Sequence, residues 1–512
     1  MLLLQSLKPT GFTVASIVVA FGGFLNGFDT GSVGAVTVMP QFRDTVGSIS
    51  PTVVGVTISM ILLTGAVPSL FAGQLADRYG RLAVISAGAA GFGVGSMLQA
   101  TSYTLGQFIA GRAIAGLGEG SFLGVMNVYI CEIAPSKRRG RLASIPQLLC
   151  AVGICLGYFT CYGTVKLQTS SMAWRTPFII ATVVSVFLAS GCYFIPHSPR
   201  WLMQQGRRDE AIQAVEWLGI QQAEAEKDIL CVGSEDMAQE SSGMVKTMIT
   251  IFTRKYRSRT VLALFILGMV QLCGIDGVLY YAPTLFSQAG LPEQTAGFLA
   301  SGISAVLICA ISIPAAMFAD RWGRRTSIIV GGIGLSGTMF LVGIMYAAKA
   351  VHRTGTGRWI VIISIFAFAL IYAATWAMVG KIYASEIQPG HTRAASNSLA
   401  QGLGFFTNGL VALITPIFLA NSAYGAYFLF GGLSFSTLVV LTLYMPETRG
   451  EPLESIQDVF SKPLRLHGIP SAVRRLVHSS VPSEAGSLSG GSSTELADIR
   501  HARAVHSLAS AV

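Results

Sequence analysis

The stretch "DRYGR", residues 77–81, decides the fold because it recurs as "DRWGRR" at residues 320–325. Two further stretches repeat in the same order. "GFD" (27–29) returns as "GID" (274–276), and "EIAPSKRRG" (132–140) returns as "EIQPGHTRA" (386–394). Three ordered matches at similar offsets indicate a chain built from two related halves. The turn glycines, Gly80 and Gly323, permit a tight turn in each half.

The composition places both halves in a lipid bilayer. Of the 512 residues, 52% are hydrophobic and 12% are charged, whereas soluble domains carry about 25% charged residues. The apolar residues form blocks of roughly 20 residues, the length of a helix that spans a bilayer. We therefore predict an all-α membrane protein with twelve transmembrane helices, six in each half, at about 12–36, 52–75, 82–101, 105–131, 142–163, 175–195, 260–286, 296–319, 326–348, 358–384, 395–420 and 425–445.

The net charge of +10 is distributed unevenly between the predicted loops. If the N-terminus is cytoplasmic, the main basic clusters fall on the cytoplasmic side, at 77–81, 136–141, 200–208, 253–259 and 321–325. Such an excess of Lys and Arg in cytoplasmic loops is the usual pattern of membrane proteins. It predicts that both termini are cytoplasmic, and it accounts for the basic charge without a nucleic-acid partner.

Breaks in the apolar pattern predict four segments. Residues 1–196 form the first six-helix half and 259–446 the second. Residues 197–258 are polar with helical spacing, which predicts cytoplasmic helices between the halves. Residues 447–512 are rich in Ser and Gly, so we expect a disordered cytoplasmic tail.

An ordered set of motifs carries a family resemblance. The set comprises "GFDTG" (27–31), "ADRYGR" (76–81), "GRAIAGLGEG" (111–120), "YICEIAPSKRRGRL" (129–142), "SPRWL" (198–202), "QLCGIDGVLYYAPTLF" (271–286), "ADRWGRR" (319–325), "YASEIQP" (383–389) and "PETRG" (446–450). With these motifs the chain resembles the sugar porter family of the major facilitator superfamily, in a fungal style. The resemblance implies alternating access to a substrate site near the midplane between two parallel repeats, and a plasma-membrane location.

Asp29 and Arg112 are charged residues inside predicted spans. Each alone would be costly in a bilayer, so we expect them to pair. The family resemblance implies that Asp29 takes up the coupling proton and that Arg112 holds Asp29 ionised until then. The alternative is a purely structural buried pair.

The resemblance also implies substrate-binding positions. Gln147, Gln271 and Asn408 match family positions that bind sugar, and Tyr280 and Tyr281 match a tyrosine pair at the outer gate. The chain departs from the family pattern at six positions, where it carries Val270, Asp276, Lys381, Gly409, Asn26 and His197. We include Asn26 among the substrate-binding candidates. His197 replaces a glutamate and alters a cytoplasmic contact.

Asp276 and Lys381 add an acid and a base to the predicted site. Three interpretations remain open. The two can form a fixed ion pair, one of them can recognise substrate, or Asp276 can be a second titrating group. As substrate contacts, Lys381 would bind the carboxylate of a sugar acid and Asp276 would bind a polyol. Gly274 and Gly277 flank Asp276 and allow an unwound turn there.

The repeated turns predict a charge latch at the cytoplasmic ends of the helices, which would form in one conformation and break in the other. The alternative is simple anchoring by arginine. The predicted latch residues are Asp77, Arg78, Arg81, Glu132, Arg139, Asp320, Arg321, Arg324, Glu386 and Arg393. The glycines of "GAAGFGVG" (88–95) and "GLGEG" (116–120) predict close helix packing rather than binding.

The leading prediction of function is proton-coupled uptake of a sugar or a sugar-like polyol. One alternative is a facilitator or exporter of a non-sugar metabolite such as a sugar acid. Another is a transporter-like nutrient sensor. No constellation typical of an enzyme is present, and we expect neither a cofactor nor a metal. The expected partners are a small-molecule substrate, the proton and the lipid bilayer.

Overall fold

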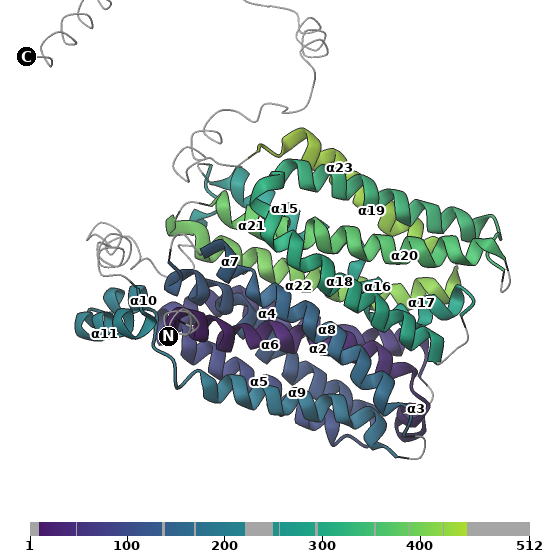
Figure 1. Ribbon diagram of the computed structural model, residues 1–512, viewed down its shortest axis with the longest axis horizontal. Helices are drawn as coiled ribbons and strands as arrows, with labels where there is room; N and C mark the ends of the chain where they lie inside the picture. Colours follow the sequence, from purple (N-terminus) through teal and green to yellow (C-terminus); the bar gives the residue numbers. More distant parts are fainter. Residues whose placement is uncertain are drawn as a thin grey trace, which may run out of the picture. The chain divides into compact units, whose positions relative to one another are not determined.

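A computed structural model describes residues 10–47, 49–135, 139–167, 170–220, 249–254, 256–291, 295–352, 355–388, 390–422 and 424–447; at 139–140, 295–299, 316–322, 378, 385–386 and 390–395 it describes the backbone alone. These residues are helical, with no strand among them. The prediction of an all-α fold in two six-helix halves is confirmed. Figure 1 shows the halves side by side, the first in purple to blue and the second in green.

The first half contains six long helices. They are α2 (Gly11–Val38), α4 (Pro51–Tyr79), α5 (Arg81–Ala100), α6 (Leu105–Ile133), α8 (Ile145–Thr164) and α9 (Met172–Gly191). Two short helices, α3 (Pro40–Val46) and α7 (Arg139–Ala143), lie between them in sequence. Each long helix is a candidate membrane span by length and hydropathy.

The second half has the same number of spans, two of them interrupted. Its helices are α15 (Arg257–Gln271), α16 (Ile275–Tyr280), α17 (Ala282–Gln288), α18 (Thr295–Trp322), α19 (Arg324–Ala347), α20 (Thr356–Ala374), α21 (Trp376–Glu386), α22 (Gly390–Asn421) and α23 (Gly425–Tyr444). Within the described residues, eleven helical segments are long and apolar enough to cross a membrane, and Ala300–Ala315 of α18 is a shorter apolar helix.

The repeated turns lie at one end of the helix bundle, which we call the basic end. Gly80 joins α4 to α5 with a φ of 96°, and Gly323 joins α18 to α19 with a φ of 79°. A side chain is strained at these positive φ values, so glycine allows the chain to reverse without a loop. The predicted tight turns are confirmed in both halves.

The interruption of the seventh span also depends on a glycine. Gly274 has a φ of 92°, and a Cβ there would lie 2.6 Å from the Phe430 ring. The backbone therefore leaves helix α15 after Gln271 and starts α16 at Ile275. The predicted unwound turn beside Asp276 is confirmed at Gly274, whereas Gly277 is helical and packs against Thr415.

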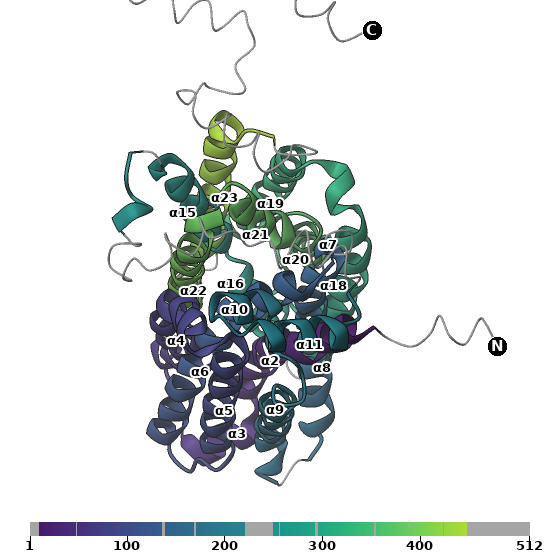
Figure 2. The same ribbon diagram turned by 90° about the vertical axis from the view of Figure 1, so that its left-hand side faces the viewer.

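Two short helices follow the first half. α10 (Pro199–Gln204) and α11 (Arg208–Leu218) lie beside the start of α2, at the basic end (Figure 2). A Cβ on Gly11 would lie 2.1 Å from the carbonyl oxygen of Trp217, so α11 packs directly on the backbone of α2. The predicted linker helices are present up to Leu218; residues 221–248 and the tail after 447 lie outside the described residues.

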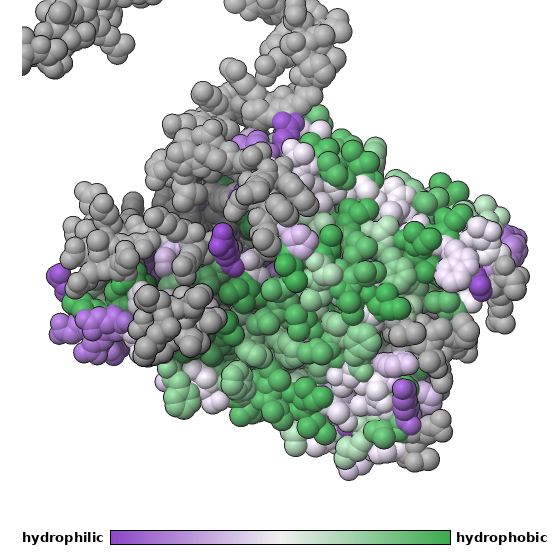
Figure 3. Space-filling view, in the orientation of Figure 1, coloured by the Kyte–Doolittle hydropathy of each residue, from purple (hydrophilic) through white to green (hydrophobic). Residues whose placement is uncertain are grey.

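The surface agrees with insertion in a bilayer. Large apolar side chains such as Val183, Val186, Val330 and Ile363 are exposed around the middle of the bundle. In Figure 3 a continuous apolar band covers this middle, and hydrophilic residues gather toward both ends. The chain is an integral membrane protein with several spans.

Glycines set the closest helix contacts, as the sequence predicted. Cβ atoms on Gly116 and Gly120 would lie 2.2 and 2.0 Å from carbonyl oxygens of α4, and one on Gly118 would lie 2.4 Å from a carbonyl oxygen of α5. Backbones that approach this closely leave no room for a side chain. The glycines of "GLGEG" are therefore packing positions. Glu119 between them has a different role.

Candidate functional site

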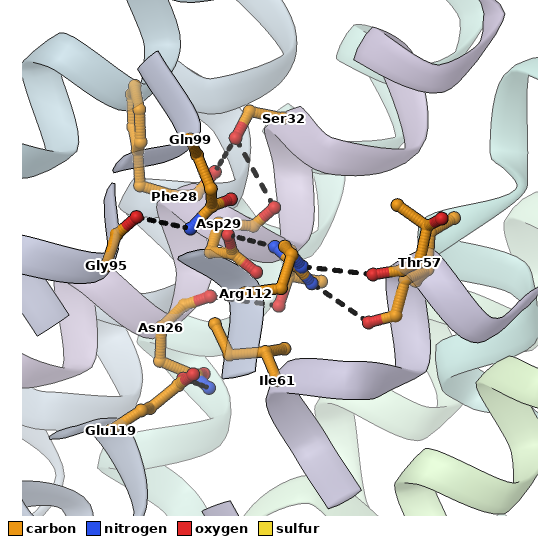
Figure 4. Close-up of polar contacts among 12 residues, drawn as sticks. Asn26, Phe28, Asp29, Ser32, Thr57, Ile61, Gly95, Gln99, Arg112 and Glu119 are labelled. Carbon is orange, nitrogen blue, oxygen red and sulfur yellow. Dashed lines mark hydrogen bonds and ion pairs between the residues drawn. The ribbon is translucent and has the colours of Figure 1, made fainter. Parts of the chain in front are cut away.

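The buried pair Asp29–Arg112 lies at the centre of the candidate site. Arg112 on α6 is fully buried, and its Nη1 donates to Asp29 Oδ1 on α2 at 2.6 Å. Its Nε and Nη2 donate to the carbonyl oxygens of Thr57 and Ile58 on α4, at 3.2 and 2.9 Å. The predicted pair is confirmed, and the guanidinium links three helices of the first half (Figure 4).

Glu119 is a second buried carboxylate beside this pair, and the sequence analysis missed it. Its Oε1 accepts a hydrogen bond from Asn26 Nδ2 at 2.6 Å, while Oε2 has no partner among the described residues. Asn26 Oδ1 in turn faces the Cys150 thiol at 3.3 Å. Glu119 follows Arg112 by seven residues, so both lie on one face of α6. That spacing was the signal available in the sequence.

Asn26 is therefore occupied by contacts within the first half. Its amide bridges α6 and α8, through Glu119 and Cys150. A direct substrate contact would have to share this amide. The substrate role of Asn26 stays a prediction.

Lys381 contacts a glutamine of the opposite half. Its Nζ donates to Gln147 Oε1 at 3.2 Å, which joins α21 to α8. Gln271, the last residue of α15, accepts a hydrogen bond from the Tyr372 hydroxyl at 3.1 Å. Within the described residues, the amide NH₂ groups of Gln147 and Gln271 make no hydrogen bond, so they can donate to a substrate.

Asp276 lies on α16 and is buried, with no salt bridge to Lys381 within 4.0 Å in the described part of the chain. Its Oδ2 has no hydrogen-bond partner there, and neither does Asn408 Oδ1 on α22. Of the three interpretations left open, the fixed Asp276–Lys381 ion pair is not formed in this structure, where Lys381 instead reaches across to Gln147. The interpretations of Asp276 as a substrate contact or as a titrating group remain.

The two predicted gate tyrosines point to different halves. Tyr280 packs against α2, with its hydroxyl 3.4 Å from Thr30 Oγ1 and its carbonyl oxygen against the backbone of Gly34. Tyr281 donates to the carbonyl oxygen of Ala412 on α22, within its own half. Tyr280 therefore makes the contact between halves at the end opposite the basic end, together with Tyr158, whose hydroxyl donates to the carbonyl oxygen of Leu279.

At the basic end of the first half, three helices meet at Arg81. This side chain is buried and bonds both Asp77 (2.9 Å) and Glu132 (2.9 Å for the closest pair). Arg78 is exposed and stacks over the Tyr79 ring at 5.3 Å instead. Arg81 joins helices of one half, so this cluster does not link the two halves in this structure.

A carboxylate caps the helix that follows the equivalent turn of the second half. Glu447 accepts the backbone N–H groups of Arg324 and Arg325, at 2.8 and 3.0 Å, and so caps the start of α19. Arg325 also donates to the carbonyl oxygen of Thr442 at 2.7 Å. Glu447 lies in the motif "PETRG" and was not predicted as a site residue.

His197 occupies the corresponding place in the first half. Its Nδ1 lies 3.4 Å from the Cβ position of Gly80, at the start of α5, and its ring packs on Trp201 at 5.2 Å. That nitrogen is buried without a partner among the described residues. Burial, and then the nearby Arg207, lowers the pKa of His197 below its usual value. Within the described part of the first half, no carboxylate caps the start of α5 as Glu447 caps the start of α19.

The other latch candidates cannot be placed at the level of side chains. Arg139 begins α7, and Asp320 and Arg321 lie at the end of α18. Glu386 ends α21, and Arg393 lies in the first turn of α22. These five side chains lie outside the described residues, and their latch role stays a prediction.

Comparison with known proteins gives the family. The family model described as "Sugar (and other) transporter" matches residues 15–460. The MFS-type transporter criB of Aspergillus cristatus is 30% identical over 460 residues, which cover 88% of this chain and 94% of criB. A probable quinate permease of Neosartorya fischeri is 29% identical over 474 residues, which cover 87% of each chain.

Among solved structures, the fold is similar to that of the proton:xylose symporter XylE of E. coli bound to 6-bromo-6-deoxy-D-glucose. The TM-score is 0.74 at 22% identity, with 88% of this chain and 99% of XylE covered. Together with the paired halves, the interrupted spans and the match over most of the chain, this makes the chain a member of the sugar transporter family of the major facilitator superfamily.

Proposed function

We propose that this protein is a secondary active transporter that couples inward proton movement to uptake of a sugar or a sugar-like polyol by alternating access. The observation that carries the proposal is the buried Asp29–Arg112 pair, because Arg112 is bonded to Asp29 on α2 and also to two carbonyl oxygens on α4. When a proton neutralises Asp29, the guanidinium keeps its two carbonyl partners on α4. Only the bond to α2 is weakened.

The position of α2 explains how this change can reach the other half. α2 carries Asp29, the adjacent Thr30, and Gly34 about one and a half turns further along; Thr30 and Gly34 meet Tyr280 of α16. A change in the bond between α2 and α6 therefore acts on the helix that closes the end opposite the basic end. This is a direct physical route from proton binding to alternating access.

The polar groups between the halves favour a substrate rich in hydrogen-bond donors. Asp276 Oδ2 and Asn408 Oδ1 are acceptors without a partner among the described residues. Lys381 Nζ already donates to Gln147. Hydroxyl groups of a polyol would satisfy these acceptors, whereas the carboxylate of a sugar acid would face Asp276 with the same charge.

A facilitator or exporter of a sugar acid remains the second candidate. Lys381 is its support, since it can leave Gln147 for a substrate carboxylate, and a relative is described as a probable quinate permease. A nutrient sensor is the third candidate; its expected signalling segment would be the tail after 447, which lies outside the described residues.

The basic end fits the cytoplasmic side by its excess of Lys and Arg. We accordingly place both termini in the cytoplasm and the protein in the plasma membrane. We assign the first half to residues 1–196, the linker to 197–258, the second half to 259–446 and the tail to 447–512. In this scheme Arg81, Asp77 and Glu132 hold helices of the first half together at the basic end and form no bond between the two halves.

The test is uptake into proteoliposomes with and without an inward proton gradient, with neutral sugars, polyols and sugar acids as substrates. We expect accumulation of a polyol or sugar only with the gradient, and loss of this accumulation in Asp29→Asn. Equal uptake after the gradient is collapsed, or full accumulation by Asp29→Asn, would refute proton coupling. Substrate binding without counterflow would favour a sensor.

A further inference from the structure

Glu119 is the buried ionisable group that the proposed mechanism does not yet use. It is 1% exposed and lies in the middle of α6. Its Oε1 is taken by Asn26, and its Oε2 has no partner among the described residues. Relative to Arg112 it is seven residues closer to the basic end, a rise of about 10 Å along a helix.

The charges around Asp29, Arg112 and Glu119 do not balance when all three are ionised. Arg112 is bonded to Asp29 and to two carbonyl oxygens, which leaves no salt bridge for Glu119 within the described residues. An ionised carboxylate at bilayer depth costs roughly 2.5–3.5 kcal/mol on insertion scales. Two carboxyl groups and one guanidinium have no net charge only when one of the two carboxyl groups is protonated.

The neighbouring helices do not supply the missing positive charge. Besides Arg112, the ionisable groups that interact with Glu119 are Asp29 on α2, Cys150 on α8 and Tyr280 on α16. Asp276 interacts with both Cys150 and Tyr280, and Lys381 interacts with Cys150. Lys381 donates to Gln147, and counting it together with Asp276 adds one positive and one negative charge, so the excess of one carboxylate remains. The charged residues of α4 and α5, namely Asp77, Arg78 and Arg81, all lie at the basic end.

We propose that Glu119 is a second proton-binding residue of the coupling site and exchanges one proton with Asp29. In the exchange an O–H bond on Asp29 breaks and one forms on Glu119 Oε2, with water as the carrier and no change in total charge. Asp29 then pairs with Arg112, as the structure shows. Glu119 lies on the basic side of Arg112, so the proton moves one step toward that end.

This inference rests on the proposed proton coupling, and its test uses Glu119→Gln. The variant preserves the size of the side chain and an acceptor for Asn26, but it cannot release a proton. Proton-transfer residues contribute on the order of 10²–10⁴-fold to rates. We expect accumulation driven by the proton gradient to fall at least about tenfold more than substrate counterflow, which needs no net proton movement, and the pH dependence of uptake to flatten.

Three comparisons make the test specific. Glu216→Gln makes the same chemical change on the exposed face of α11 and is expected to match the wild type. The double variant Asp29→Asn/Glu119→Gln is expected to be no worse than Asp29→Asn, because two residues on one proton path lose it only once. Glu119→Asp retains a carboxyl group and is expected to keep coupling with a shifted pH profile.

Several results would overturn the proposal. One is that Glu119→Gln accumulates substrate like the wild type and keeps the wild-type pH profile. If Glu119→Gln does not fold, an unchanged pH profile in Glu119→Asp would have the same meaning. Another is an effect of Glu119→Gln on the KM of counterflow alone, which would make Glu119 a substrate contact. In each case proton coupling itself would stand if Asp29→Asn still abolished accumulation.

Discussion

Replacing Gly34 by alanine should shift the conformational equilibrium of the transporter. Gly34 of α2 lies against Tyr280 of α16, and its added Cβ would be 1.7 Å from the Tyr280 carbonyl oxygen. Contacts under 3.0 Å do not occur for Cβ atoms, so the halves must separate by more than 1 Å at this end. The conformation that opens this end has no such contact to lose.

The size of the effect follows from the cost of overpacking. Inserting a methyl group into a packed contact costs typically 1–3 kcal/mol, which corresponds to a shift in population of about 5- to 150-fold. Because the substituted residue keeps a helical backbone, and Gly→Ala favours helix, the cost falls on the contact between halves and not on α2 itself. We therefore expect a displaced equilibrium in a folded protein.

The assay is a distance measurement by spin labels at the end opposite the basic end. Asp44 on α3 and Gln288 on α17 are exposed and belong to different halves, and each can be replaced by cysteine in a cysteine-free background. Gly34→Ala should enrich the longer distance and slow uptake. Gly163→Ala is the matched control, since its Cβ would meet nothing within 4 Å. A distance distribution like that of the wild type would refute the proposed contact between α2 and α16.

Two further predictions concern the basic end and the substrate. Glu447→Gln removes the charge of the α19 cap and should lower thermal stability by about 1 kcal/mol, whereas His197→Glu should raise stability by adding the equivalent cap. The folded state lowers the pKa of His197, so the unfolded chain binds more protons. The wild type should therefore lose stability as pH falls below about 6.5, and His197→Glu should not show this pH-dependent loss. Equal thermal-unfolding curves for the two proteins from pH 7.5 to 5.5 would contradict this prediction. Asp276→Asn should weaken polyol binding by roughly 10- to 100-fold, as expected for a lost charged hydrogen bond, whereas Lys381→Ala should keep polyol uptake. If Asp276→Asn retained polyol affinity and Lys381→Ala lost it, Lys381 and not Asp276 would be the residue that binds the polyol.

The fold followed from the sequence because its determinants are local. Blocks of about 20 apolar residues can only be satisfied in a bilayer as helices. The glycines at 80 and 323 predicted the tight turns from their place in the repeated motif, and the structure confirms a positive φ at both. The Asp29–Arg112 pair was also predictable, since two opposite charges in apolar spans have few other ways to be stabilised.

Other parts of the site were not predictable because they depend on which helices meet. Lys381 and Asp276 looked like an ion pair from charge alone, but in the structure the Lys381 side chain reaches Gln147 of the other half. Glu119 was grouped with the glycines around it, although its spacing from Arg112 placed it on the same face of α6. The cap formed by Glu447 requires the chain after α23 to return to the start of α19, which no local pattern announces.

The sequence by itself thus determined the number and length of the spans, the duplication, the turns and one buried ion pair, because these depend on hydropathy, backbone conformation and charge within short segments. Only the tertiary structure decided the partners of Asn26, Glu119, Lys381 and His197. Each of these polar groups lies where helices from distant parts of the chain pack together, and hydrogen bonds act over about 3 Å. Which donor lies within that distance is set by helix packing and not by sequence spacing.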